Sequence, residues 1–326
     1  MCKIVFSSDL HGNLDQYSSI VQLATKEQAS IIVFGGDLFL KGSISASTKT
    51  IEAQRVYFTD KILPIVKDYS GHVFFTFGNA DFYIIVDVLR KYIVQENFTN
   101  IHVVNDEVVQ IPNSKIKLLA YAGVPFTRHM LKDWERFDTC DPQEHSLRDL
   151  SYIVTKGAVS YNYEQFNYLT NGLNLKEYLV EDDQQKVLLK YGPNINYVNL
   201  PTLENVQLMK NFSIECQMRR ILNDCKQEDY TNMIWIIHGP PYGTNLDVLK
   251  TKTHCGSRAV RQLIHEFQPL ASFHGHIHET VDMSGSYKDK IGNTHCYSSG
   301  NYPNMKLVSA IVINTREADK AKRVTV

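Results

Sequence analysis

The stretch LASFHGHIH, residues 270–278, is a short apolar run that ends in a glycine flanked by histidines. A run of this length followed by Gly275 has the pattern of a buried strand that ends in a sharp turn. Four other short apolar runs also end in polar side chains beside glycine. The five endings are SDLHGN at residues 8–13, GGD at 35–37, GNAD at 78–81, HGPP at 238–241 and HGHIH at 274–278.

The order of apolar runs predicts an α/β fold. Runs of strand length alternate with helical patterns in the first 120 residues and again after residue 232, with helices expected at about 51–68 and 257–267. This order predicts a partly parallel sheet covered by helices. The expected strands cover residues 3–7, 31–34, 73–77, 101–104, 116–122, 233–237, 270–273, 294–298 and 307–313.

The polar residues that follow these strands are expected to meet at one place. The carboxyl ends of parallel strands lie on one edge of a sheet, where open α/β folds bind ligands. Because side chains alternate along an extended chain, Asp9 and His11 share one side, and so do His276 and His278. Two aspartates, one asparagine and four histidines can therefore line one site. They are Asp9, His11, Asp37, Asn79, His238, His276 and His278.

The size of this set favours two metal ions. Seven ligands are too many for one four-coordinate zinc and suit two ions that share a bridging carboxylate. Asp37 stands alone at its strand end, between the other groups, and is the expected bridge. Two divalent ions against two carboxylates leave an excess of positive charge. That excess is what phosphate-ester chemistry requires.

The ordered motifs DLH, GGD, GNAD, HGPP and GHIH resemble those of the calcineurin-like metallophosphoesterase superfamily. Within it, HGPPYGTNLD followed by GSRAVRQLIHEFQPLASFHGHIHE is similar to a branch of compact microbial phosphoesterases. The resemblance covers residues 1–127 and 233–315. It implies a four-layer αββα sandwich, in which two mixed β-sheets pack together between outer helices. It also implies a dinuclear metal-dependent phosphohydrolase.

The resemblance distributes the ligands over two divalent ions, with Asp37 shared. It assigns Asp9, His11, Asp37 and His278 to one ion, and Asp37, Asn79, His238 and His276 to the other. Mixed imidazole and carboxylate ligands fit manganese, iron or zinc. The implied mechanism is in-line attack on phosphorus by a metal-bridging hydroxide, without a covalent enzyme intermediate.

Ala80 departs from the family pattern. The family commonly has a histidine at this position of GNAD, which contacts phosphate or protonates the leaving group, and a methyl group does neither. A general acid contributes about 10² to 10⁴ in rate and matters least when the leaving oxygen has a low pKa. We therefore expect a phosphodiesterase that prefers good leaving groups over alkyl monoesters. Small-molecule phosphate esters or nucleotides are the expected substrates.

Four further residues are candidates around the site. His254 precedes, and Arg258 begins, the helix expected from about residue 257, whose N-terminus could receive an anion while Arg258 pairs with phosphate oxygens. The alternative is a surface loop with a solvated arginine. His274 is expected to hydrogen-bond a ligand from outside. Asp81 could do the same or be structural.

Composition excludes several classes of protein. With 43% hydrophobic and 21% charged residues, the chain is ordinarily globular, and its formal net charge of -1 gives no general attraction to nucleic acid or anionic membrane. No apolar run approaches the roughly 20 residues that span a bilayer. Six scattered cysteines without a CxxC pair argue against a zinc knuckle or a dense disulfide framework, and they favour reduced thiols in a cytoplasmic protein. A homodimer is compatible with the sequence.

Residues 128–232 lack the strand and helix alternation of the rest. This segment is rich in Tyr, Asn, Asp and Gln, and its clearest element is a helix near 203–225. We expect one metallophosphoesterase domain over residues 1–326, with this segment as a largely helical or irregular insertion. It could form a cap that selects substrate, or a packing or dimerisation element.

Two other functions stay open at this point. A scaffold that keeps the fold for protein binding and has lost catalysis need not keep every ligand, and this chain keeps all seven. A nuclease is the second alternative. The near-neutral charge gives no support for the salt-dependent phosphate binding expected of a nuclease.

Overall fold

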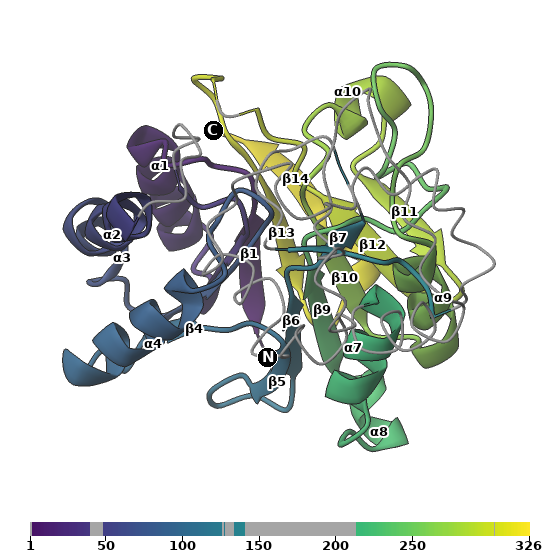
Figure 1. Cartoon of the computed structure of the whole chain (residues 1–326), viewed down its shortest axis with the longest axis horizontal. Coiled ribbons are helices and arrows are strands. Elements are labelled where there is room, and N and C mark those ends of the chain that lie inside the picture. The colour runs from purple at the N-terminus through teal and green to yellow at the C-terminus, as the bar shows by residue number, and fades with distance from the viewer. Residues whose placement is uncertain (1, 40–47, 126, 128–133, 141–212, 303) are drawn as a thin grey trace, which may run out of the picture.

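The computed structural model describes residues 2–39, 48–125, 127, 134–140, 213–302 and 304–326. Two six-stranded mixed sheets pack face to face in it. Helices α1 to α4 cover the outer face of one sheet, on the left of Figure 1, and α7 and α9 cover the outer face of the other, on the right. These four layers confirm the expected αββα sandwich.

Sheet A combines the first four strands of the chain with the last two. Its strand order is β14-β13-β1-β2-β3-β4, in which β1 to β4 are parallel and β13 and β14 are antiparallel to their neighbours. Its strands are β1 Lys3–Ser7, β2 Ile31–Gly35, β3 His72–Thr76, β4 Ile101–Val103, β13 Ser309–Asn314 and β14 Lys322–Thr325.

Sheet B has the order β11-β12-β10-β9-β6-β5. Its four inner strands are parallel, and both edge strands are antiparallel to their neighbours. Its strands are β5 Glu107–Gln110, β6 Lys117–Tyr121, β9 Met233–Ile237, β10 Ala271–His274, β11 Lys288–Ile291 and β12 Thr294–Ser298. A separate two-stranded pair joins β7 Val124–Pro125 to β8 Glu135–Arg136.

The helices at 48–66 and 258–267 lie where the sequence predicts them. The expected helix at 51–68 consists of α2 and α3, joined by a π-helical turn at Phe58–Ile62. The α-helices are α1 Leu14–Lys26, α2 Thr48–Tyr57, α3 Leu63–Val66, α4 Ile85–Gln95, α7 Ile214–Leu222, α8 Gln227–Tyr230, α9 Arg258–Phe267 and α10 Thr280–Ser284, and a 3₁₀ helix covers Ala318–Lys320.

Strand β1 shows why the central strands are apolar on both sides. Ile4 and Phe6 belong to the cluster between the two sheets, whereas Val5 faces the helices on the outer side of sheet A. A strand that is covered on both faces has no solvent side, so its sequence reads as a continuous apolar run. Packing on both faces therefore holds β1 in place, and the polar residues from Ser8 onward follow directly at its carboxyl end.

The segment predicted as an insertion is described only at residues 134–140 and 213–232. These two stretches lie side by side, since the amide of Ile214 donates to the carbonyl of Phe137 at 2.7 Å. Helix α7 packs on the outer face of sheet B through Met218 and Leu222. The N-terminal part of the helix expected near 203–225 falls on residues 141–212, outside the described residues. The cap role of the insertion and the single domain over residues 1–326 stay predictions.

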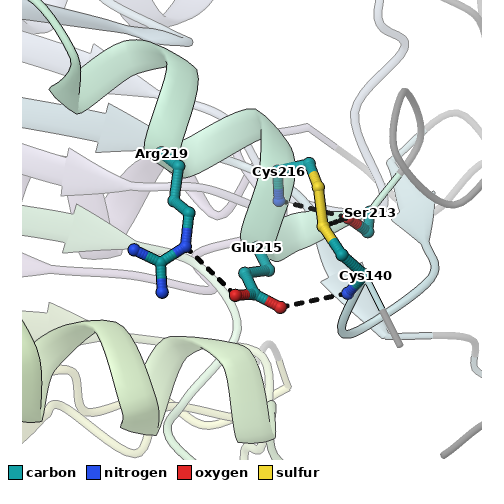
Figure 2. The surroundings of a disulfide bond; sticks show 5 residues. All are labelled: Cys140, Ser213, Glu215, Cys216 and Arg219. Atoms are coloured by element: carbon teal, nitrogen blue, oxygen red, sulfur yellow. Dashed lines mark hydrogen bonds and ion pairs between the residues drawn. A yellow bond between two sulfur atoms is a disulfide. The ribbon is translucent and has the colours of Figure 1, made fainter.

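Cys140 and Cys216 form a disulfide, with their Cα atoms 6.3 Å apart (Figure 2). The expectation of six reduced thiols is therefore wrong for this pair. A sequence separation of 76 residues leaves no local spacing that would reveal the pairing. The other cysteines are free. The cytoplasmic location, which relied on reduced thiols, stays a prediction.

No helix in the described part of the chain is both long and apolar enough to cross a membrane.

Candidate metal centre

The predicted ligands lie at the carboxyl ends of parallel strands from both sheets. Those that follow β1, β2 and β3 come from sheet A, and those that follow β9 and β10 come from sheet B. Backbone hydrogen bonds hold the neighbouring loops in register. The amide of Asp9 donates to the carbonyl of Gly36 at 3.0 Å, and the amide of His11 to that of Asp37 at 2.9 Å.

The first group of ligands comprises Asp9, His11, Asp37 and His278. One ligand atom from each lies within 4.8 Å of the others. His11 Nε2 is 3.2 Å from His278 Nε2, and His278 Nε2 is 3.6 Å from Asp9 Oδ1. Asp9, His11 and Asp37 are buried, while His278 is partly exposed. The donor atoms of this group therefore lie close together, and His278 is the member that is partly open to solvent.

The second group of ligands surrounds the amide of Asn79. Its Oδ1 lies 2.7 Å from His276 Nδ1 and 3.2 Å from His238 Nε2. His238 Nδ1 is 3.0 Å from the carbonyl oxygen of Gly35. Because a carbonyl only accepts, Nδ1 carries the ring proton and Nε2 is left as the ligand atom that faces Asn79.

Asp37 lies between the two groups. Its Oδ2 is 3.4 Å from His11 Nε2, and its Oδ1 is 3.4 Å from His238 Nε2. The amide of Ala80 donates to Oδ1 at 2.8 Å. Burial alone would raise the pKa of Asp37, but the adjacent imidazoles of His238 and His11 and the Ala80 amide outweigh burial and lower it. The carboxylate is thus charged at neutral pH and faces both groups at once.

The backbone at this centre is held in an unusual conformation. Asp9, His11, Asp37 and His276 have φ angles of 61°, 44°, 51° and 70°. Non-glycine residues seldom adopt this left-handed region, and such outliers gather at functional sites where the surrounding structure enforces them. Four of the seven predicted ligands therefore lie on strained turns, which points to a functional site.

The donor atoms of the first group fit a divalent cation. In the first group, two imidazole nitrogens face each other at 3.2 Å, and carboxylate oxygens lie beside them. Two such nitrogens cannot both carry a proton at this distance, whereas a shared cation satisfies both of them and the carboxylates. The second group adds imidazole nitrogens and a neutral amide oxygen. Imidazole nitrogens and carboxylate or amide oxygens are ligand atoms that bind divalent metal ions in proteins.

Asp81 binds the backbone of the neighbouring loops. It accepts hydrogen bonds from the amides of Leu38 at 2.9 Å, Phe39 at 3.2 Å and Gly78 at 2.9 Å. Burial and the nearby charge of Asp37 raise the pKa of Asp81. The residue joins the turn that carries Asp37 to the turn that carries Asn79, so the contacts of Asp81 are those of a structural role.

His274 supports the backbone around His238. Its Nδ1 lies 2.9 Å from the carbonyl oxygen of Ile237 and 3.2 Å from that of Gly239, and its Nε2 lies 2.9 Å from Ser272 Oγ. Burial lowers its pKa to about 4. The neutral ring therefore holds the carbonyls of the residues on either side of His238, Ile237 and Gly239, whereas the sequence predicted a bond to a ligand side chain.

His254 and Arg258 lie on the loop and helix after β9. His254 Nδ1 is 2.7 Å from Asp247 Oδ1, a carboxylate that is fully buried. The Arg258 guanidinium lies over the ring of Tyr242, 5.2 Å from its centroid. Their contact with substrate stays a prediction.

The N-terminus of α9 already holds a carboxylate of the chain itself. The amides of Arg258 and Ala259 donate to Asp138 at 2.7 Å and 3.3 Å, and the hydroxyl of Ser257 also donates to it. The anion at this helix terminus is therefore Asp138. Sequence reasoning missed this residue, because it lies 120 positions before Arg258.

The family model of calcineurin-like phosphoesterases matches residues 2–280. The chain belongs to the calcineurin-like phosphoesterase family. Calcineurin-like phosphoesterases act on phosphate esters with divalent metal ions, and the Asp and His cluster of this member is a possible site for them.

Solved structures agree with this phosphoesterase fold. One crystal structure superposes with a TM-score of 0.57 at 14% identity, over 99% of this chain and 98% of the other. The crystal structure of TT1561 from Thermus thermophilus superposes with a TM-score of 0.50 at 15% identity, over 100% and 98% of the two chains. These identities show the fold alone. No curated protein matches the sequence.

Proposed function

We propose that this phosphoesterase is a dinuclear metal-dependent phosphodiesterase that acts on small-molecule phosphate esters or nucleotides. The position of Asp37 carries the proposal. One of its oxygens faces His11 and the other faces His238, each at 3.4 Å. A carboxylate shared in this way suits two ions, because each oxygen can bind one.

Each of the two groups of ligands described above would hold one ion. Asp9, His11 and His278 would hold one ion with Asp37, while Asn79 is the neutral member of the other set. When bound, two divalent ions activate water as a nucleophile and neutralise charge on the phosphoryl oxygens. Asn79 adds no charge, so the site keeps the positive excess that attracts a phosphate ester.

Ala80 supports the preference for diesters. Its amide still orients Asp37, at 2.8 Å from Oδ1, but its methyl group cannot donate a proton. A substrate whose leaving oxygen has a low pKa needs no such donor. The chain therefore keeps what the metal site requires and lacks the acid that a poor leaving group requires.

Metal analysis combined with a substrate panel tests the proposal. The panel contains aryl phosphodiesters, cyclic nucleotides, aryl and alkyl phosphomonoesters and single-stranded DNA. We expect two ions per chain and turnover that is highest with the diesters. Asp37→Ala should lower metal affinity by more than the roughly 10- to 100-fold typical for an outer partner of a ligand, while Asp60→Ala, an exposed carboxylate on the π-helical turn, should not. A wild-type protein that binds no divalent metal, or binds two ions and hydrolyses nothing on the panel, refutes the proposal.

The substitution Ala80→His tests the preference separately. Turnover of alkyl monoesters should rise by up to about 10² to 10⁴, because a general acid becomes available. Diesters with good leaving groups should change little. Unchanged monoester turnover in a folded, metal-loaded variant would show that Ala80 does not set the preference.

His254 and Arg258 are proposed to contact the substrate. Each is replaced by glutamine, which keeps a polar side chain but removes the imidazole or the positive charge. We expect KM to rise in both variants while metal content is unchanged. Wild-type KM values in both would remove these residues from the site.

A further inference from the structure

We infer that Ser8 and Ser299 form a buried hydroxyl relay that positions the Asp9 carboxylate for metal binding. This inference rests on the proposed metal centre and adds two positioning residues to it. Ser8 Oγ donates to Asp9 Oδ2 at 2.6 Å, and Ser299 Oγ lies 3.0 Å from Ser8 Oγ. Ser8 is 1% exposed and Ser299 is 0% exposed, so water does not compete for these bonds.

The donors around Ser299 set the direction of the relay. Ser299 Oγ lies 3.3 Å from the amide nitrogen of Ser8 and 3.3 Å from Asn301 Nδ2, and both groups only donate. The oxygen of Ser299 therefore accepts, and its own proton points to Ser8 Oγ. The proton of Ser8 is then directed at Asp9 Oδ2. Each hydroxyl donates toward the carboxylate.

The amide of Asn301 has a fixed orientation as well. Its Oδ1 accepts from the amide of Ser309 at 2.8 Å, which identifies that atom as the oxygen. Its Nδ2 donates to the carbonyl of Ser8 at 3.0 Å. Because Asn301 cannot flip without losing these bonds, it keeps Ser299 in an accepting role.

The relay determines which oxygen of Asp9 faces the metal centre. Oδ2 is occupied by Ser8, while Oδ1 lies 3.6 Å from His278 Nε2 and 3.9 Å from His238 Nε2. Oδ1 also accepts from the amide of His276 at 3.0 Å. The carboxylate is thus held at both ends, with Oδ1 toward the other ligands.

The relay also connects the two sheets. Asp9 follows β1 of sheet A, and Ser299 follows β12 of sheet B, 291 positions from Ser8. Gly275 leaves room for the connection, since a Cβ there would lie 2.5 Å from Asp9 Oδ2 and 2.7 Å from Ser8 Oγ. The glycine of the GHIH motif therefore also leaves space for the Ser8 hydroxyl beside the Asp9 carboxylate.

Titration of metal-free protein with Mn²⁺, followed by calorimetry, tests the relay. Ser299→Ala and Ser8→Ala should each lower the affinity for one of the two Mn²⁺ ions by roughly 10- to 100-fold, which is the usual effect of removing a partner that orients a ligand. The double variant should be no weaker than either single variant, because both changes break the same chain of bonds. Ser299→Thr, which keeps the hydroxyl, should recover affinity.

Ser298→Ala is the matched control. Ser298 is the neighbouring residue on β12 and is equally buried, and within the described residues its hydroxyl makes no hydrogen bond. The Ser298→Ala variant should bind Mn²⁺ with wild-type affinity. Wild-type affinity in Ser299→Ala and Ser8→Ala overturns the relay alone, as does equal weakening in Ser298→Ala. A wild type that binds no ion overturns the proposed function together with the relay.

Discussion

Replacing Gly78 by alanine tests whether the close approach of Asp37 and His238 sets the activity. A Cβ at position 78 would lie 2.4 Å from Asp37 Oδ1 and 2.6 Å from His238 Cε1. These distances are up to 1 Å short of the 3.4 Å at which ordinary contact begins. Both neighbours are buried. The backbone nitrogen of Asp37 would lie at 2.5 Å, so the added methyl group must displace the Asp37 backbone and carboxylate or the imidazole by up to about 1 Å.

A displacement of this size near reacting groups costs roughly 100-fold in rate. The corresponding loss of transition-state stabilisation is about 2.7 kcal/mol, at about 1.36 kcal/mol for each tenfold change. The assay is kcat/KM for an aryl phosphodiester at saturating Mn²⁺. Circular dichroism of the same samples confirms that the variant is folded.

Gly239→Ala provides the matched control. It adds the same methyl group next to His238, but the nearest atoms would lie at 3.4, 3.5 and 3.6 Å. This variant should keep wild-type activity. If folded Gly78→Ala also stays within about threefold of the wild type, the reasoning from steric overlap is refuted.

Two further predictions concern stability. Cys216→Ser should lower the free energy of unfolding by about 4 kcal/mol in urea denaturation, because the disulfide closes a loop with a sequence separation of 76 residues. Cys225→Ser changes a free thiol and should have a much smaller effect; equal losses would contradict the cross-link. Burial and the adjacent His72 lower the pKa of His102 from 6.5 to about 4. As pH falls from 6.5 to about 4, the unfolded chain therefore binds a proton at His102 that the folded chain does not bind, and the free energy of unfolding decreases. His102→Gln should flatten that loss, and an unchanged pH profile would contradict it.

The best predicted elements are strands that are buried on both faces. The run at 233–237 coincides with β9 Met233–Ile237, because the two sheet faces bury every residue of it. Edge strands β5 Glu107–Gln110 and β11 Lys288–Ile291 were not predicted. They are half-exposed or carry lysines, and they form by pairing with β6 and β12. Their strand conformation depends on a partner rather than on their own apolar pattern.

Helix α4, Ile85–Gln95, was also missed, although its sequence held a usable pattern. Ile85, Val86, Leu89 and Ile93 recur at helical spacing and are the residues that it buries. The cause differs from that of β5 and β11, since here the local pattern was sufficient.

The chemistry of the centre was predictable because it depends on residue type and local order. A strand that ends in Asp, Asn or His beside glycine presents that side chain at a known edge of a parallel sheet, wherever the sheet lies. The sequence could therefore name the seven residues that the structure brings together at this edge, and Asp37 as the one that lies between His11 and His238. It could also show that Ala80 lacks an acid, since a methyl group has no proton to give.

Local sequence was sufficient for the succession of strands that are buried on both faces, for the family motifs and for the residue types at the strand ends. Folding in three dimensions was needed to bring ligands from two sheets face to face, to pair Cys140 with Cys216, and to place Ser299 beside Ser8. The physical reason is the distance along the chain over which each interaction acts. Periodicity and turn chemistry act over a few residues, whereas contacts between positions 76 to 291 apart exist only once the apolar faces of the two sheets have packed together.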